Sequence, residues 1–396
     1  MPSLDAELGR RLEAICQQNL LRELRRVDSP QGSRVIIGGK KFLNFSSNDY
    51  LGLANHPALK EAAIEAVKRF GVGAGASRLV SGSLAPFHTL EESLADFKGT
   101  EAALTFSTGY ATALGAITAL VGKGNIIILD KLVHASIVDA AKLSGVRMRV
   151  FANNDLNDLE DILKWSSTRL ATNPACSPGH TLIVTESIFS MDGDAAPLRE
   201  IVELKNRYGA WLMVDEAHAT GLYGKHRRGL TEELGVSEQI DIHMGTLGKA
   251  IGAGGGYICG SRKLIDLLVN QARSFIFSTA PVPASVAAAT AGIALIRSAE
   301  GAALNARLWN HVKAFRSEIP DVKSKTHSAI LPIILGAESK ATALAASLHE
   351  YNIFVPAIRY PTVAKNSARL RVTLSAAHTD PDIAELTKAL KTLIGK

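Results

Sequence analysis

Lys249 is the residue whose type and surroundings most clearly suggest chemistry. It lies in the run DIHMGTLGKA (241–250), and a glycine-rich segment, 252–256, follows. A lysine among small uncharged residues is a candidate for a lowered pKa, and a neutral amine can attack a carbonyl carbon to form a Schiff base. A phosphate-binding P-loop is disfavoured because His243 replaces its first glycine and Ala250 its Mg²⁺-binding hydroxyl. A surface lysine in a turn stays the competing interpretation unless other functional residues accompany it.

Other polar residues follow four of the predicted buried strands. In chain order they are Asp130 and His134, Glu186 and Ser190, Asp215 and His218, and Thr246 with Lys249. Ligands of a parallel sheet bind outside the carboxyl ends of its strands, so these side chains can meet at one edge. Each alone has a structural explanation, because a histidine can belong to the core and an aspartate can simply end a strand. Their coincidence with an isolated lysine favours a shared site.

Glycine-rich segments add an anion-binding element to this set. The run STGY (107–110) opens a predicted helix, and free backbone N–H groups at a helix N-terminus suit an anion. The run GVGAGASR (71–78) is not a dinucleotide fingerprint, since its third glycine is misplaced and no apolar strand precedes it. An amine, a carboxylate, imidazoles and a phosphate cradle together predict a pyridoxal phosphate site. There a carboxylate keeps the pyridine nitrogen protonated, and the ring can then accept electron density.

The elements that position these residues alternate regularly between about residues 125 and 260. Strand-like runs are expected at 126–129, 146–151, 182–185, 211–214, 240–244 and 257–259, and helices at 136–143, 156–165 and 198–208. This alternation predicts an α/β fold with a mostly parallel sheet covered by helices on both faces. Beyond about residue 286, strand-like runs at 329–335, 353–358 and 370–374 and a closing helix at 381–394 indicate a smaller α+β domain.

The N-terminal part is predicted to contain one helix and a β segment. Apolar residues recur at helical intervals from Leu4 to Arg26, before the stop signal Asp28-Ser29-Pro30, and β-like runs follow at 34–37 and 41–45. The expected divisions are an N-terminal helix and β segment (1–45), a large cofactor-binding α/β domain (46–290) and a small C-terminal α+β domain (291–396).

Composition narrows the class of protein. The 396 residues carry a net charge of +6 with dispersed basic residues and only 6% aromatics, which argues against a nucleic-acid binder. Cys16, Cys176 and Cys259 are odd in number, scattered and without metal-ligand spacing, so we expect a reducing compartment, no disulfide framework and no metal site. No signal peptide or membrane-spanning run is recognisable, and a cytoplasmic protein without membrane contacts is expected.

Six segments resemble a known family. They are LNFSSNDYLG (43–52), ESIFSMDGDAAPL (186–198), VDEAHATG (214–221), GTLGKA (245–250), FIFSTA (275–280) and AIRYPTVAKNSARLRVTLSAAH (357–378). Along essentially its whole length the chain resembles the α-oxoamine synthases, a branch of the fold-type-I pyridoxal phosphate enzymes. The resemblance implies an acyltransferase of that fold, with pyridoxal 5′-phosphate as cofactor, acting as a homodimer with a shared active site.

The resemblance also implies roles for individual residues. Lys249 would form the Schiff base with the cofactor and remove the Cα proton of the amino acid. Asp215 would pair with the pyridinium nitrogen, His218 would hydrogen-bond the phenolic oxygen, and His134 would stack over the ring.

The remaining positions would bind the phosphate and the substrates. Ser190 would lie beside the phenolic oxygen, Gly109, Tyr110 and Thr246 would hold the phosphate, and Thr279 would reach the phosphate of the other subunit. Asn48 would lie near the bound amino acid, Arg359 would bind the amino-acid carboxylate, and Arg25 would bind the acyl substrate, with Arg22 and Arg26 as alternatives in register.

Within the family, segment 357–378 and the lack of an N-terminal extension favour the branch that acts in biotin biosynthesis. That branch condenses L-alanine with a pimeloyl thioester of coenzyme A or acyl carrier protein. The form GTLGKA is also common in branches that use glycine, so a ligase of glycine and acetyl-CoA, or another acyl-CoA substrate, stays an alternative. A nucleotide-binding oxidoreductase built on 71–75 and a non-enzymatic binding module are less favoured.

Overall fold

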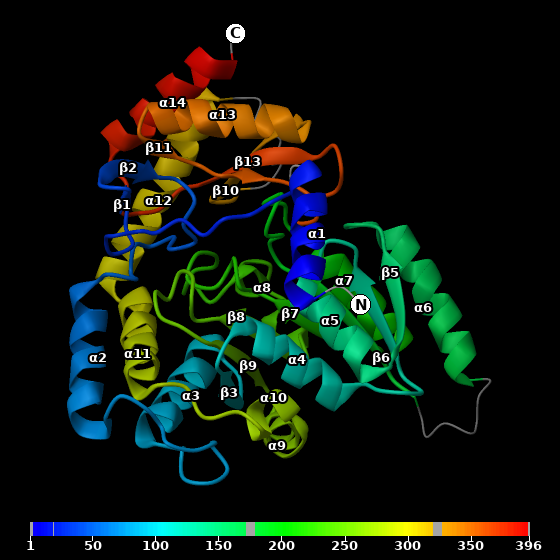
Figure 1. Cartoon of the computed structure of the whole chain (residues 1–396). Coiled ribbons are helices and arrows are strands. Elements are labelled where there is room, and N and C mark those ends of the chain that lie inside the picture. Colours follow the sequence, from blue (N-terminus) through cyan, green and yellow to red (C-terminus); the bar gives the residue numbers. More distant parts are fainter. Residues whose placement is uncertain (1–2, 19, 172–178, 320–326, 395–396) are drawn as a thin grey trace.

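A seven-stranded sheet forms the centre of the molecule in this computed structural model, which describes residues 3–18, 20–171, 179–319 and 327–394 (Figure 1). In spatial order the strands are β3 (Ala102–Phe106), β9 (Gly256–Gly260), β8 (Ile242–Thr246), β7 (Trp211–Asp215), β6 (Thr181–Glu186), β4 (Ile126–Asp130) and β5 (Arg147–Phe151). Only β9 runs against its neighbours, pairing antiparallel with both β3 and β8. The predicted mostly parallel sheet is confirmed.

Helices cover both faces of this sheet, because its apolar strands have no polar side. Along β4, Ile126 and Ile128 belong to one buried cluster, and Ile127 and Leu129 belong to the other. One face is covered by α4 (Gly109–Leu120), α5 (Ala135–Ser144), α9 (Arg262–Gln271) and α10 (Arg273–Ile276). The other is covered by α3 (Ala85–Lys98), α6 (Leu156–Ala171) and α7 (Leu198–Tyr208). Such double coverage explains the continuous apolar runs that predicted a parallel sheet.

Two small three-stranded sheets make up the rest of the β structure. One contains β10 (Ile330–Gly336), β13 (Ala368–Thr373) and β12 (Ala357–Ile358), and the other contains β1 (Arg34–Ile37), β2 (Lys40–Asn44) and β11 (Ile353–Phe354). The N-terminal hairpin therefore joins the C-terminal part, as the blue strands among orange and red elements of Figure 1 show. The expected single strand at 353–358 is wrong: it divides at Pro356, which has no N–H to donate, and its halves pair with different sheets.

The predicted N-terminal helix is too long. α1 (Leu4–Gln17) ends before residue 20, and the following segment is extended up to the bridge between Val27 and Ile37. No side chain of α1 is buried, so its apolar period carries no packing that would extend the helix.

The remaining helices are α2 (Pro57–Phe70), α8 (Leu230–Glu233), α11 (Pro283–Arg297), α12 (Ala299–Glu318), α13 (Glu338–Glu350), α14 (Asp380–Ile394) and the 3₁₀ turn Ser237–Gln239. α11 packs on both α2 and α3. Among the described residues no helix is long and apolar enough to cross a membrane, and no cluster of His, Cys, Asp or Glu could hold a metal ion. Cys16 and Cys259 are free thiols, whereas Cys176 lies outside the described residues. The domain limits expected at residues 45 and 290 stay predictions.

Candidate active site

Three strand ends place acidic and hydroxyl side chains at one edge of the large sheet. Glu186, Asp215 and Thr246 are the last residues of β6, β7 and β8, and Glu186 pairs directly with Asp215. Directly paired residues of neighbouring strands point to the same face, here the face that α4 and α5 cover. Asp130, at the end of β4, alternates to the other face, and its carboxylate accepts the N–H groups of Leu132 and Asn154. Asp130 therefore does not join the other strand-end residues.

Lys249 lies in the loop after β8 and meets His218 from the loop after β7. Its Nζ atom is 2.8 Å from His218 Nε2, and His218 Nδ1 is 2.6 Å from the hydroxyl of Tyr50. Burial lowers the pKa of Lys249 to about 8, although Asp215 and Glu186 act in the opposite direction. Burial and the charge of Lys249 hold the pKa of His218 well below its usual range. A neutral imidazole thus supports an amine that is readily deprotonated.

Asp215 and His134 lie within electrostatic reach of that amine. Asp215 Oδ1 accepts the N–H of Ala217 at 2.9 Å, and burial raises the pKa of this carboxyl while the charge of Lys249 lowers it. His134 is the N-cap of α5, and its Nδ1 is 2.8 Å from the hydroxyl of Ser136. Burial lowers the pKa of His134, with Asp215 opposing the effect. The ring of His134 is therefore held in place by its own helix.

Arg371, which the sequence interpretation missed, enters the site from β13. Its Nε donates to the carbonyl of Ser190 at 2.6 Å, and its Nη1 donates to Asn48 Oδ1 at 3.0 Å. The guanidinium is buried, and its charge lowers the pKa of Lys249 and of His218. Among the described residues no carboxylate forms an ion pair with it. A signal existed, because an arginine in the apolar strand run of residues 370–374 needs an anionic or polar partner.

A helix N-terminus faces Thr246. Thr108 caps α4, and a Cβ atom on Gly109 would lie 3.8 Å from Thr246 Oγ1. A Cβ on Gly256 would lie only 2.9 Å from the N and Cα atoms of Gly109, so glycine permits this close approach. Tyr110, the second residue of α4, donates its hydroxyl to Asp139. No acidic residue lies in the first turn, which leaves the positive end of the helix suited to a phosphate.

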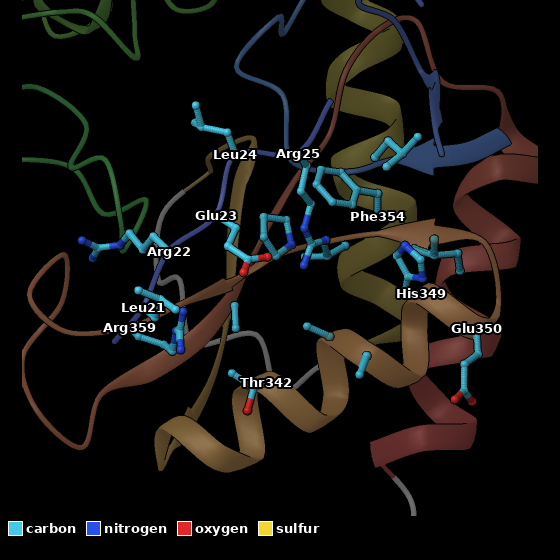
Figure 2. A pocket seen from close by; sticks show the side chains of 17 residues that line it. Leu21, Arg22, Glu23, Leu24, Arg25, Thr342, His349, Glu350, Phe354 and Arg359 are labelled. Atoms are coloured by element: carbon cyan, nitrogen blue, oxygen red, sulfur yellow. The ribbon is translucent and has the colours of Figure 1, made fainter. Parts of the chain in front are cut away.

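Two predicted substrate arginines lie in a separate pocket of about 1050 Å³ (Figure 2). Its walls are segment 21–25, α13 and the chain from Ile353 to Arg359. Arg25 lies 5.5 Å over the ring of Phe354, and in Figure 2 Arg22 and Arg359 lie toward the other end. Arg26 does not line this pocket and pairs with Asp28. Arg359 thus shares this pocket with Arg22 and Arg25.

Thr279 does not join these residues within the chain. It bridges to Ser77, and its side chain is exposed in a surface segment with Phe277 (70% exposed) and Val282 (46% exposed).

The residues fit pyridoxal phosphate. The amine of Lys249, with its lowered pKa, matches the aldehyde of the cofactor, and the buried carboxylate of Asp215 matches its pyridine nitrogen. The N-terminus of α4, which glycine allows the chain to approach closely, matches its phosphate. In the described part of the chain the buried Oε1 atom of Glu186 has no hydrogen-bond partner, which is consistent with a polar site between these groups.

Comparison with known proteins agrees with this geometry. The family model for aminotransferase class I and II matches residues 40–390. An 8-amino-7-oxononanoate synthase of Geobacter sulfurreducens is 47% identical over 382 residues, which are 96% of this chain and 95% of that protein. The chain belongs to the α-oxoamine synthase family. An 8-amino-7-oxononanoate synthase of Thermoanaerobacter pseudethanolicus is 43% identical over 384 residues, 96% of this chain and 95% of that protein.

Solved structures of related enzymes superpose on most or all of the chain. A serine palmitoyltransferase from S. paucimobilis with bound pyridoxal phosphate and myriocin has a TM-score of 0.89 at 28% identity and covers 100% of both chains. An 8-amino-7-oxononanoate synthase from Francisella tularensis has a TM-score of 0.74 at 27% identity, covering 89% of this chain and 98% of that one. The expected fold-type-I architecture, pyridoxal phosphate dependence and acyltransferase class are confirmed.

Proposed function

We propose that the protein condenses L-alanine with a pimeloyl thioester and releases CO₂ and the thiol, the reaction of an 8-amino-7-oxononanoate synthase in biotin biosynthesis. The observation that carries this proposal is the 47% identity to such synthases over nearly the full length of both proteins. In the reaction a bond forms between the alanine Cα and the acyl carbon, the carbon–sulfur bond breaks, and the alanine carboxylate leaves as CO₂.

Pyridoxal phosphate, when bound, supplies a pyridinium ring that delocalises negative charge from the amino-acid Cα. Lys249 would hold the cofactor through Nζ, and Asp215 would keep the ring nitrogen protonated. The N-terminus of α4 at Gly109 and Tyr110, together with Thr246, would bind the phosphate. His134 would lie over the ring, and Ser190 would lie beside the phenolic oxygen.

We assign the proton transfer to Lys249, with His218 as the residue that orients its amine. A lysine with a pKa of about 8 is substantially neutral near pH 8 and can therefore accept the Cα proton at Nζ. His218 Nε2, 2.8 Å away, orients that amine, and the hydroxyl of Tyr50 at 2.6 Å from Nδ1 fixes the imidazole. The low pKa of His218 keeps this ring uncharged, so it does not compete with the ammonium form of Lys249 for Asp215.

We assign the amino-acid carboxylate to Arg371 in preference to Arg359. Arg371 is close enough to influence the pKa of Lys249, and Asn48 and the carbonyl of Ser190 fix its guanidinium. A fixed guanidinium binds a carboxylate with both charge and geometry.

Arg359, with Arg22 and Arg25, is better placed for the acyl substrate. Their pocket has apolar walls from Leu21, Ile353 and Val355, with Arg22 and Arg359 toward one end and Arg25 beside Phe354. An acyl chain that ends in a carboxylate matches that combination. This match supports a dicarboxylic acyl group such as pimeloyl.

We also propose a homodimer that shares active sites through Thr279. Exposed Phe277 and Val282 flank Thr279, and apolar surface of this kind is typical of a covered interface. Light scattering at several protein concentrations tests the oligomeric state, and a monomer at all concentrations would contradict a shared site. The free thiols of Cys16 and Cys259 support the expected cytoplasmic location.

The deciding experiment is thiol release by the purified protein loaded with pyridoxal phosphate. Pimeloyl-CoA, pimeloyl acyl carrier protein, acetyl-CoA and palmitoyl-CoA are each combined with L-alanine, glycine and L-serine, and Lys249→Ala serves as the blank. Release confined to L-alanine with a pimeloyl thioester is expected, and the two pimeloyl donors distinguish the thiol carrier. Release with glycine and acetyl-CoA alone would replace the proposed substrates by those of the glycine-using branch.

A further inference from the structure

Glu186 is a buried carboxyl group for which the mechanism above has no role. It ends β6, its Cα pairs directly with that of Asp215 on β7, and the residue is 2% exposed. Both side chains point to the face that α4 and α5 cover. The site therefore contains two neighbouring acids.

The contacts of Glu186 tie together separate parts of the site. The backbone N–H groups of His134, before α5, and of Ser190, in the loop after β6, lie close enough to its carboxyl group to lower its pKa. In the part of the chain that the structure describes, its Oε1 atom has no hydrogen-bond partner. A buried anionic oxygen without a donor costs far more than a buried oxygen of a neutral carboxylic acid. Geometry thus favours the protonated acid.

The charged and titratable groups around Glu186 agree with that state. Asp215 faces it from β7, Lys249 from the loop after β8, and Tyr50 from the loop after β2. Burial, followed by the charge of Asp215, raises the pKa of Glu186 to about 8, while Lys249 lowers it. Two like charges at this separation oppose each other, so ionisation of both carboxyl groups together is disfavoured.

We propose that Glu186 is a positioning residue that works as an uncharged carboxylic acid: it holds the main chain at His134 and Ser190 and leaves Asp215 the only negative charge of the pair. A second negative charge near Lys249 would favour its ammonium form and so oppose its action as a base. This inference rests on the proposed function, because His134 and Asp215, the residues that Glu186 would position, are the ones assigned to the cofactor.

The first test uses cofactor-free protein and is independent of the reaction. Between pH 6 and 7.5 the folded protein holds a proton on Glu186 that the unfolded chain has released, so the folding equilibrium constant falls as pH rises, by up to about tenfold per pH unit from this group. The folding equilibrium constant of Glu186→Gln, measured by urea unfolding, should lack this pH dependence. The matched control is Asp130→Asn, a buried strand-end acid on the other face whose pKa is raised by burial only to about 6. Equal pH slopes for wild type and Glu186→Gln would overturn the proposal.

The second test titrates pyridoxal phosphate into the same variants and follows its visible absorbance. Glu186→Gln is uncharged and keeps an acceptor oxygen, so we expect cofactor affinity within about threefold of wild type. Glu186→Ala should bind at least tenfold more weakly, because the main chain at His134 and Ser190 is released. An equal loss in both variants would show that the carboxylate charge is required and would overturn the proposal. Failure of the wild type to bind cofactor would contradict the proposed function, while the urea experiment would still decide the state of Glu186.

Discussion

Behind Asp215, on the other face of the large sheet, Glu216 forms a buried ion pair whose removal should be costly. Lys98 Nζ, at the end of α3, is 2.5 Å from Glu216 Oε2, and the side chains are 1% and 0% exposed. Glu216 also accepts two hydrogen bonds from Thr231, and its carbonyl accepts the N–H groups of Ala219 and Thr220. The pair thereby fixes the turn that carries Asp215 and His218.

Lys98→Met leaves the Glu216 charge uncompensated, and we expect a loss of about 3–5 kcal/mol in the free energy of unfolding. The double variant Lys98→Met/Glu216→Gln removes both charges and should recover at least about 2 kcal/mol of that loss. Lys391→Met, which breaks an ion pair with Glu318 that is 53% and 54% exposed, should cost less than about 1 kcal/mol.

Urea unfolding of the cofactor-free protein, followed by tryptophan fluorescence, measures these differences. The pKa of Glu216 is lowered to about 2, mainly by Lys98 against the effect of burial. The stability that this ionisation supplies to the wild type is present above the normal pKa of a glutamate and is lost only as pH falls toward 2, so the contribution of the pair to wild-type stability should be constant between pH 6 and 8. A loss below about 1 kcal/mol, or a double variant no more stable than the single one, would refute the reasoning.

Three further predictions concern binding. Arg371→Gln should lower kcat/KM for the amino acid about 10- to 100-fold because charged hydrogen bonds are lost, whereas Arg359→Gln should raise KM for the thioester. Steady-state kinetics with each substrate varied in turn measure both effects, and the opposite assignment of the two effects would contradict this prediction. Gly256→Ala places a Cβ atom 2.9 Å from the backbone of Gly109 and 2.4 Å from a threonine hydroxyl, so pyridoxal phosphate should bind at least about tenfold more weakly by absorbance titration; unchanged affinity would show that the backbone yields. The rate of cofactor association should rise with pH up to about 8 and then level off, because the neutral amine of Lys249 attacks; a stopped-flow rate independent of pH from 6 to 8 would refute this.

The sequence predicts six of the seven strands of the large sheet, most of them short apolar runs between turn residues; it does not predict β3, and β5 carries Arg147 and Arg149. Strand ends then locate Asp215, Thr246 and Lys249 without knowledge of the tertiary structure. Periodicity fails where packing is absent: nothing in α1 is buried, so the apolar spacing that continues to Leu24 (104% exposed) does not make a helix.

The same limit explains the residues that were missed. Arg371 lies in a strand of the C-terminal part, and its distance along the chain from Lys249 gives no hint that the two are neighbours. Only the packing of β13 near Asn48 and Ser190 brings it into the site.

The insertion of β9 between β3 and β8 has a consequence for synthesis on the ribosome. In the described sheet β3 pairs only with β9, so a nascent chain that has emerged only as far as β8 leaves β3 without a partner and one edge of β8 unpaired. When residues 256–260 emerge, β9 pairs with both β3 and β8 in one step. Because these residues follow Lys249 closely and contact Gly109, the same step brings the loop that carries Lys249 next to the N-terminus of α4, while the outer edge of β3 stays unpaired in the described sheet.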